Sequence, residues 1–159
     1  MAVLSAFMLR RSHVVAPGGG KSPVASWFDS QFGARGWRKR RFSTRIVVDG
    51  EATDSPTHEV DCYKAGVALE IEWNNKDPFF DRDLNNFRLL FELRTVSAGV
   101  IITRCDELQA LFDALGKGKS YGRSTTHMSK LLPRLEGGGG GGCPVIVFGI
   151  KTSLYREDL

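Results

Sequence analysis

The chain has 159 residues, of which 42% are hydrophobic, and this is enough for one buried core but not for two. Charged residues make up 25%, as in an ordinary globular protein, which excludes wholesale disorder. The longest apolar runs, residues 100–102 and 145–150, fall far short of the roughly 20 residues of a transmembrane helix. We therefore expect a soluble protein that does not interact with membranes.

The net charge of +4 is distributed unevenly along the chain. Residues 1–45 contain nine Lys or Arg residues and a single acid, Asp29. Clustered cations attract phosphates, so this segment is typical of a face that binds a polyanion such as DNA. An ordinary solvated basic surface is the alternative, and charge alone does not separate the two.

The N-terminal residues and the cysteines indicate the cellular compartment. The first residues are apolar, but Arg10 and Arg11 follow them instead of preceding them, which argues against a signal peptide. Cys62, Cys105 and Cys143 are odd in number and form no CxxC pair, which argues against a disulfide framework and against a zinc site. A reducing cytoplasm is the location that fits these residues best.

The first elements follow from the spacing of apolar residues. Residues 1–16 are expected to form an N-terminal extension of a catalytic domain over residues 17–159. Apolar side chains near helical spacing predict a helix over residues 23–35. Residues 42–48 alternate between apolar and mostly polar side chains and then reach a turn, which predicts a strand.

A hairpin is predicted next. A loop that contains Asp54 and Pro56 leads into a strand over residues 59–63, and a short turn at residues 64–66 leads into a second strand over residues 67–73.

The second half of the chain alternates between helices and strands. Asp81 or Asp83 is expected to cap a helix whose buried stripe runs to Leu93. The elements predicted after it are a buried strand over residues 99–103, helices over residues 106–115 and 128–135, and a last strand over residues 144–150. This order predicts an α/β fold in which helices lie on the faces of a mixed sheet.

Six consecutive glycines at residues 137–142 separate the last predicted helix from the last strand. The conformational entropy of such a tract disfavours any stable structure of its own. We therefore expect a flexible, glycine-rich loop that takes no part in chemistry.

Three acids of the predicted hairpin are the main candidates for chemistry. Side chains alternate along a strand, so Glu70 and Glu72 project from the same side. The turn folds the preceding strand back and brings Asp61 near Glu70. Two acids that alternate with apolar residues are also common on solvent-facing strands, so the pattern gains its weight from Asp61 and from the hairpin.

Crowded carboxylates repel one another unless a cation lies between them, and hard oxygen ligands suit magnesium or manganese. A divalent ion polarises a phosphoryl oxygen and lowers the pKa of a bound water, which is chemistry that hydrolyses phosphodiesters. We therefore take Asp61, Glu70 and Glu72 as candidate catalytic residues and Mg²⁺ as the cofactor.

Sequence blocks around these acids resemble one nuclease family. The longest block runs from Asp61 through EIEWNNKDPFFDRDL to GVIITR. The others are, in order, GKSP followed by a helix and GW near the start, then STTHMSKL and CPVIVFGI near the end. Over residues 17–151, these blocks together resemble the BglII/BstYI-type restriction endonucleases of the PD-(D/E)xK nuclease superfamily.

The resemblance implies a restriction-endonuclease-like fold and a homodimer that cleaves both strands of duplex DNA. Asp61 and the backbone carbonyl of Ile71 would hold magnesium, with Glu70 as a further metal ligand and Glu72 completing the metal and water shell. At the position of Glu72, the superfamily often has Lys and the family commonly has Gln. This chain departs from both patterns, which leaves open the number of metal ions and the group that accepts the nucleophile's proton.

Candidate DNA contacts follow the acidic strand. Asn75 and Lys76 come directly after it, and Asn can read adenine while Lys can contact phosphate or guanine. A polar turn is the alternative for this pair. Arg104 ends a buried strand, and ligands gather at such sheet ends, although Arg104 can instead pair with Asp106.

A second group of candidate DNA contacts comprises Ser124, Thr125, Thr126 and His127. They precede a predicted helix, where hydroxyls and free backbone amides form an anion site. Helix capping explains one of these hydroxyls but hardly all three. For His127, phosphate binding or core packing is favoured over a general base, because nothing in the sequence places it near Asp61.

A glycine-rich segment near the start resembles the end of a nucleotide-binding P-loop. It contains Gly20, Lys21 and Ser22, but Val15 stands where the first glycine is required and Pro23 interrupts the following turn. We therefore do not expect nucleotide hydrolysis.

The leading hypothesis is a magnesium-dependent, sequence-specific type II endonuclease that acts on double-stranded DNA as a symmetric homodimer, because two-fold sites are most simply read by two-fold proteins. One alternative is a DNA repair or junction nuclease on the same fold. The other is a DNA-binding module that has lost cleavage, which the departure at Glu72 and the short chain both suggest.

Overall fold

A five-stranded mixed sheet forms the centre of the protein, whose computed structural model describes residues 2–55 and 57–158. The strand order is β2-β5-β6-β7-β8, with antiparallel pairing from β2 to β6 and parallel pairing from β6 to β8. These strands are β2 (Arg38–Arg40), β5 (Val60–Lys64), β6 (Val67–Glu72), β7 (Ala98–Arg104) and β8 (Val145–Ile150). The predicted mixed sheet with flanking helices is confirmed.

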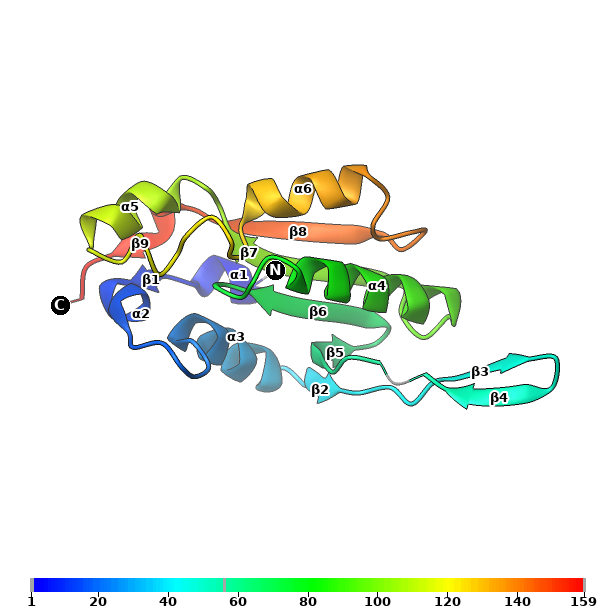
Figure 1. The fold of residues 1–159 in the computed structure, drawn as a ribbon. Coiled ribbons are helices and arrows are strands. Elements are labelled where there is room, and N and C mark those ends of the chain that lie inside the picture. The colour runs from blue at the N-terminus through cyan, green and yellow to red at the C-terminus, as the bar shows by residue number, and fades with distance from the viewer. Residues whose placement is uncertain (1, 56, 159) are drawn as a thin grey trace.

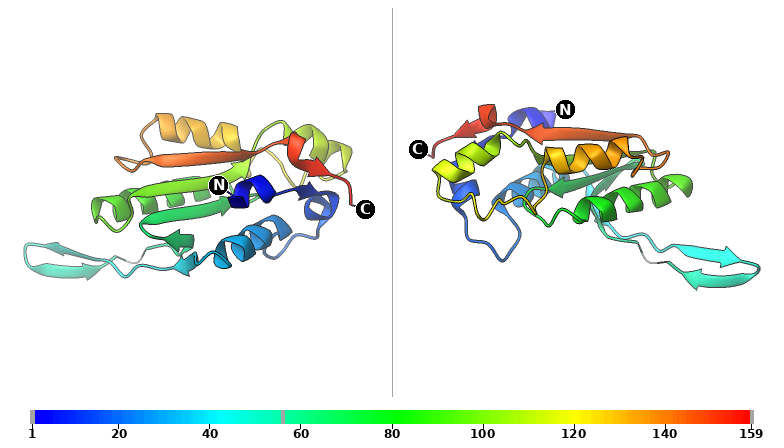
Figure 2. Two further views of the ribbon diagram at one scale, coloured as in Figure 1. Left: turned by 180° about the vertical axis from the view of Figure 1, so that it is seen from behind. Right: turned by 45° about the horizontal axis from the view of Figure 1, so that its top comes forward.

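Helices cover both faces of this sheet (Figures 1 and 2). One face packs against α4 (Phe79–Glu92) and α6 (Met128–Glu136). The core on the other face includes α1 (Ala2–Ala6), α2 (Arg11–Val15), α3 (Pro23–Gly33) and α5 (Leu108–Ala114). The two cores are separate because side chains alternate along β6, so that Leu69 belongs to one core and Ala68 to the other.

The first helix predicted by spacing is confirmed as α3. Its N-cap is Ser22, whose hydroxyl accepts a hydrogen bond from the Ala25 amide, and Pro23 occupies the first turn, where no amide hydrogen is needed. The predicted hairpin is also confirmed. β5 and β6 are joined at Ala65 and Gly66, which have positive φ angles of 47° and 80°.

The strand predicted over residues 42–48 is misplaced. β3 (Arg45–Val48) pairs only with β4 (Glu51–Asp54), in a two-stranded ribbon that projects from the body (Figure 1). Asp54 therefore ends a strand and is not part of a loop. The edge strand of the central sheet, beside β5, is β2. The three residues of β2 are all basic and exposed, so this strand has no alternating apolar pattern that would predict it.

The expected capping of the second long helix by an aspartate is wrong. Pro78 is the N-cap of α4, and the helix begins at Phe79. Asp81 lies in the first turn and accepts hydrogen bonds from Arg134 on α6. Asp83 lies two residues further on, on the opposite side of the helix, and is completely buried.

The two ends of the described chain pack together. β1 (Leu9–Arg10) pairs in parallel with β9 (Tyr155–Arg156), which follows a 3-10 turn at Thr152–Leu154. Phe7, Leu9 and Val14 are buried in the core. The segment predicted as an extension therefore contributes core residues, while the domain boundary at residue 16 stays a prediction.

The glycine tract forms hydrogen-bonded turns, and the expected flexible connector is in this respect wrong. The Gly139 amide donates to the Arg134 carbonyl at 2.8 Å, and the Gly141 amide donates to the Gly138 carbonyl at 2.9 Å. The tract also packs against α4, because a Cβ atom at Gly141 would lie 2.6 Å from Arg88. These close contacts are possible because glycine has no side chain.

Gly139→Ala is expected to lower the free energy of unfolding by about 1–3 kcal/mol, the usual cost of overpacking. The new Cβ atom would lie 2.7 Å from the backbone carbonyl oxygen of Arg134 and 3.1 Å from Leu84. Chemical denaturation measures this loss. Gly18→Ala is the control, because nothing lies within 4 Å of a Cβ atom there, and equal stability losses in both variants would contradict the packed tract.

Candidate active site

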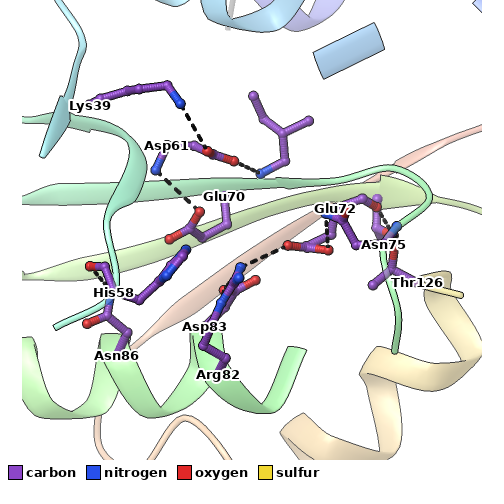
Figure 3. A network of polar contacts seen from close by, with 12 residues as sticks. Lys39, His58, Asp61, Glu70, Glu72, Asn75, Arg82, Asp83, Asn86 and Thr126 are labelled. Atoms are coloured by element: carbon purple, nitrogen blue, oxygen red, sulfur yellow. Dashed lines mark hydrogen bonds and ion pairs between the residues drawn. The ribbon is translucent and has the colours of Figure 1, made fainter. Parts of the chain in front are cut away.

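The β5–β6 hairpin places Asp61 beside Glu70 (Figure 3). The Asp61 backbone amide donates to Glu70 Oε2 at 3.3 Å, and Asp61 Oδ2 accepts from the Ile71 amide at 3.1 Å. Lys39, on the neighbouring strand β2, lies 4.0 Å from Asp61 Oδ1. The Asp61 carboxylate is therefore held between two strands, next to one cation.

Glu70 and Glu72 project toward α4, as strand alternation predicts. Both are 1% exposed. Glu72 accepts from Asn75 at 2.9 Å and from Arg82 at 3.4 Å. Arg82 also donates to Asp83 at 2.7 Å, so a single guanidinium joins the acid of the strand to the acid of the helix.

The single Arg82 guanidinium does not offset the crowding of the three buried acids Glu70, Glu72 and Asp83. Burial and then the charge of Asp83 raise the pKa of Glu70 well above its usual range. The same two causes raise the pKa of Glu72 to about 9, while burial raises that of Asp83 to about 6 against the opposing pull of Arg82. Glu70 Oε1 and Asp83 Oδ2 are buried and have no hydrogen-bond partner among the residues that the structure describes. Buried, unpartnered carboxylate oxygens fit the preference of Mg²⁺ for oxygen ligands.

The three predicted acids do not converge on one point. In Figure 3, the carboxylates of Asp61 and Glu70 lie on opposite sides of the β6 ribbon. Within residues 2–55 and 57–158, no three side chains of His, Cys, Asp or Glu come together closely enough to hold a metal ion. The expected convergence of the Asp61, Glu70 and Glu72 carboxylates is therefore wrong, because Asp61 lies on one side of β6 and the two glutamates lie on the other.

Three charged residues of this region were missed by sequence reasoning. Lys39 lay within a basic segment that indicated either a polyanion-binding face or a solvated surface, with nothing that placed it beside Asp61. Asp83 was interpreted as a helix cap, although its position four residues before the buried Phe87 places it on the stripe of α4 that faces the sheet. Arg82 precedes Asp83 and has no motif, so only the packing of α4 on β6 reveals its role.

Comparison with known families identifies the chain. A model of the restriction endonuclease BglII/BglIII family matches residues 1–150. The chain belongs to this family. Membership implies a type II site-specific deoxyribonuclease with double-stranded DNA as its substrate. No curated protein matches the chain.

Within the described residues, no helix has the length and apolar character needed to cross a membrane.

The structure brings the two predicted DNA-contact segments of this restriction endonuclease together. Lys76 and Thr125 form an antiparallel bridge, and the Thr126 amide donates to the Asn75 carbonyl at 2.8 Å. Asn75, Lys76 and Ser124 are exposed. This exposed edge follows directly on β6 and its two acids.

The remaining hydroxyls and the histidine of this segment point inward. Thr126 is completely buried and its hydroxyl accepts from the Asn75 amide, while the Thr125 hydroxyl donates to Gly122. His127 Nδ1 lies 2.6 Å from the Thr125 carbonyl, and burial lowers its pKa. Asp106 accepts from Ser129 in the first turn of α6, so a carboxylate already occupies part of the expected anion site.

Arg104 holds the loop before α6 in place. It is 1% exposed and donates to the Tyr121 carbonyl and to the Thr125 hydroxyl, both at 2.9 Å. Its guanidinium also lies over the Phe112 ring, 5.4 Å from the centroid. These hydrogen bonds hold the segment that carries the exposed Ser124 in place. A direct contact of Arg104 with DNA stays a prediction.

Arg82→Leu is expected to lower the free energy of unfolding by about 3 kcal/mol at pH 8, because it leaves buried carboxylates without their cation. The loss should shrink at pH 5, below the pKa of about 6 at Asp83. Chemical denaturation at both pH values measures it. Arg134→Leu is the matched control, since its partner Asp81 is 52% exposed and such pairs contribute about 0–1 kcal/mol. Equal losses in the two variants would contradict the buried network.

Proposed function

We propose that this restriction endonuclease cleaves double-stranded DNA at a specific sequence in a magnesium-dependent reaction, with Asp61 and Glu70 at its catalytic centre. The observation that carries the proposal is the hydrogen bond from the Asp61 amide on β5 to Glu70 Oε2 on β6. The other oxygen of this carboxylate, Glu70 Oε1, is buried and has no hydrogen-bond partner among the described residues. A carboxylate oxygen in this state needs either a proton or a cation. Mg²⁺ is the cation that its chemistry favours.

Asp61 and the backbone carbonyl of Ile71 would hold the metal, and Glu70, whose carboxylate lies on the other side of β6, would join them by turning toward Asp61 (Figure 3). When bound, the ion would polarise the phosphoryl oxygen and lower the pKa of the attacking water. Asp61 is kept oriented by its hydrogen bond from the Ile71 amide, and Glu70 by its bond from the Asp61 amide. Glu72 is tied to Asn75 and Arg82, which supports a role in orienting the exposed edge relative to the acids.

The DNA-binding surface would include the edge formed by Asn75, Lys76 and Ser124, which is exposed and adjoins the catalytic strand. Thr125, Thr126, His127 and Arg104 would act mainly by shaping this edge. A homodimer is the assembly that we infer, because a two-fold DNA site is read most simply by two copies of one chain. Three free cysteines support a reducing, cytoplasmic location.

Incubation of the protein with plasmid DNA tests the proposal, in one arm with MgCl₂ and in a parallel arm with EDTA. We expect discrete fragments with MgCl₂ and intact plasmid with EDTA, and sequencing of the fragment ends would give the recognition site. Nicks confined to branched or damaged DNA would favour a repair or junction nuclease. Retarded but uncut DNA in both arms would favour a binding module without cleavage.

A further inference from the structure

A cavity of about 390 Å³ opens beside Asp61, on the face of β6 that lies away from Glu70. Its floor includes Asp61, Ile71 and Trp73, and its rim is formed by the glycine-rich segment before α3. Its lining includes three lysines but only one acid, Asp61. The cavity therefore places an excess of positive charge directly next to the proposed catalytic carboxylate.

Two of these lysines approach Asp61 from different elements. Lys39 on β2 has its ammonium 4.0 Å from Asp61 and 3.9 Å from Glu59, and its side chain is 51% exposed. Lys21, in the segment before α3, forms an ion pair with Asp29. Burial and then the charge of Lys39 lower the pKa of Lys21, while Asp61 opposes this shift, so all three charges are near one another. The other acids paired with these lysines, Asp29 and Glu59, are themselves partly exposed to solvent.

The glycine-rich rim leaves this cavity open. A Cβ atom at Gly18, Gly19 or Gly20 would meet nothing within 4 Å, so the segment contributes backbone but no bulk. The Ser22 hydroxyl is already used to cap α3, and Pro23 has no amide hydrogen. Pro23 thus interrupts the run of backbone amides that a nucleotide-binding loop presents, and the positive charge that attracts an anion comes from the lysines.

We propose that Lys39 and Lys21 bind one phosphate of the DNA backbone in this cavity and so position the strand that Asp61 acts on. The inference rests on the proposed function, because it takes DNA as the ligand. The ammonium groups of Lys39 and Lys21, which line the cavity, balance the combined charge of one phosphodiester and the Asp61 carboxylate, and so they offset the repulsion between that phosphate and Asp61. Both residues are positioning residues, since they fix the backbone and leave the chemistry to the acids.

The test is equilibrium binding of duplex DNA in EDTA, measured over a series of NaCl concentrations. Each phosphate contact contributes about 0.9 to the slope of log binding constant against log salt concentration. Lys39→Gln and Lys21→Gln are each expected to weaken binding and to lower the slope, and because the two lysines share one phosphate, the two reductions together should come to about this amount. Arg94→Gln removes one exposed charge at the opposite end of the sheet, between α4 and β7, and should leave the slope unchanged.

Lys39→Arg keeps the charge and separates electrostatics from folding. We expect it to retain the wild-type slope, with a melting temperature equal to that of Lys39→Gln. If both glutamine variants keep the wild-type slope, or if Lys39→Arg binds as weakly as Lys39→Gln, the phosphate site is wrong while the nuclease assignment stands. Failure of the wild-type chain to bind duplex DNA would instead overturn the proposed function.

Discussion

Asp61→Asn is expected to reduce DNA cleavage by about a thousandfold or more, because metal-derived stabilisation of the transition state amounts to several kcal/mol and each 1.36 kcal/mol changes the rate tenfold. Asparagine keeps the shape of Asp61 and can still accept a hydrogen bond from the Ile71 amide, so the hairpin should remain intact. Cleavage of plasmid DNA in MgCl₂ measures the loss, and duplex binding in EDTA checks that recognition survives.

Asp54→Asn is a suitable control for this experiment, because Asp54 lies on the projecting β3–β4 ribbon and is 81% exposed. We expect it to cleave like the wild type. Glu70→Gln should behave like Asp61→Asn, since Glu70 is the acid paired with Asp61 across the hairpin. Full activity of either active-site variant would remove the basis for placing the catalytic centre on β5 and β6.

The free energy of unfolding is expected to fall as the pH rises from 7 to 9 in EDTA. Glu70 and Glu72 have folded-state pKa values raised above their unfolded values, so in this window the folded chain binds more protons than the unfolded chain. Their stabilising contribution is complete below about pH 4.5 and is lost as the pH rises toward about 9 at Glu72. Each proton involved corresponds to about 1.4 kcal/mol per pH unit.

Glu72→Gln provides the matched comparison. The neutral amide fits the same space beside Asp83 without a titrating proton, so the fall with pH should be shallower by about one proton. The histidines with lowered pKa values titrate below this window. Burial raises the pKa of the Cys62, Cys105 and Cys143 thiols, which adds to the fall near pH 9 in both proteins, so the difference between the two proteins isolates Glu72. Urea denaturation at pH 7, 8 and 9 measures the difference. Identical pH profiles for the two proteins would mean that Glu72 is not protonated in the folded state.

Local patterns predicted those parts of the fold whose signal lies within one segment. The spacing of Val24, Phe28 and Phe32 predicted α3, because an amphipathic helix repeats its buried side chains every three or four residues. The β5–β6 hairpin followed from two extended segments around the turn at Ala65 and Gly66. The hairpin also accounts for the nearness of Asp61 and Glu70, because it brings the Asp61 amide within hydrogen-bond distance of Glu70 Oε2, but it did not reveal that their carboxylates lie on opposite sides of β6 (Figure 3).

The sequence alone determined that acids on a β-hairpin form the candidate site and that the chain resembles a restriction endonuclease. Only the tertiary structure decided which charges surround those acids. Arg82 and Asp83 reach Glu72 through the packing of α4, and Lys39 reaches Asp61 through the pairing of β2 with β5. Such contacts depend on how separate elements dock. Long charged side chains carry no periodic signal that would reveal their partners.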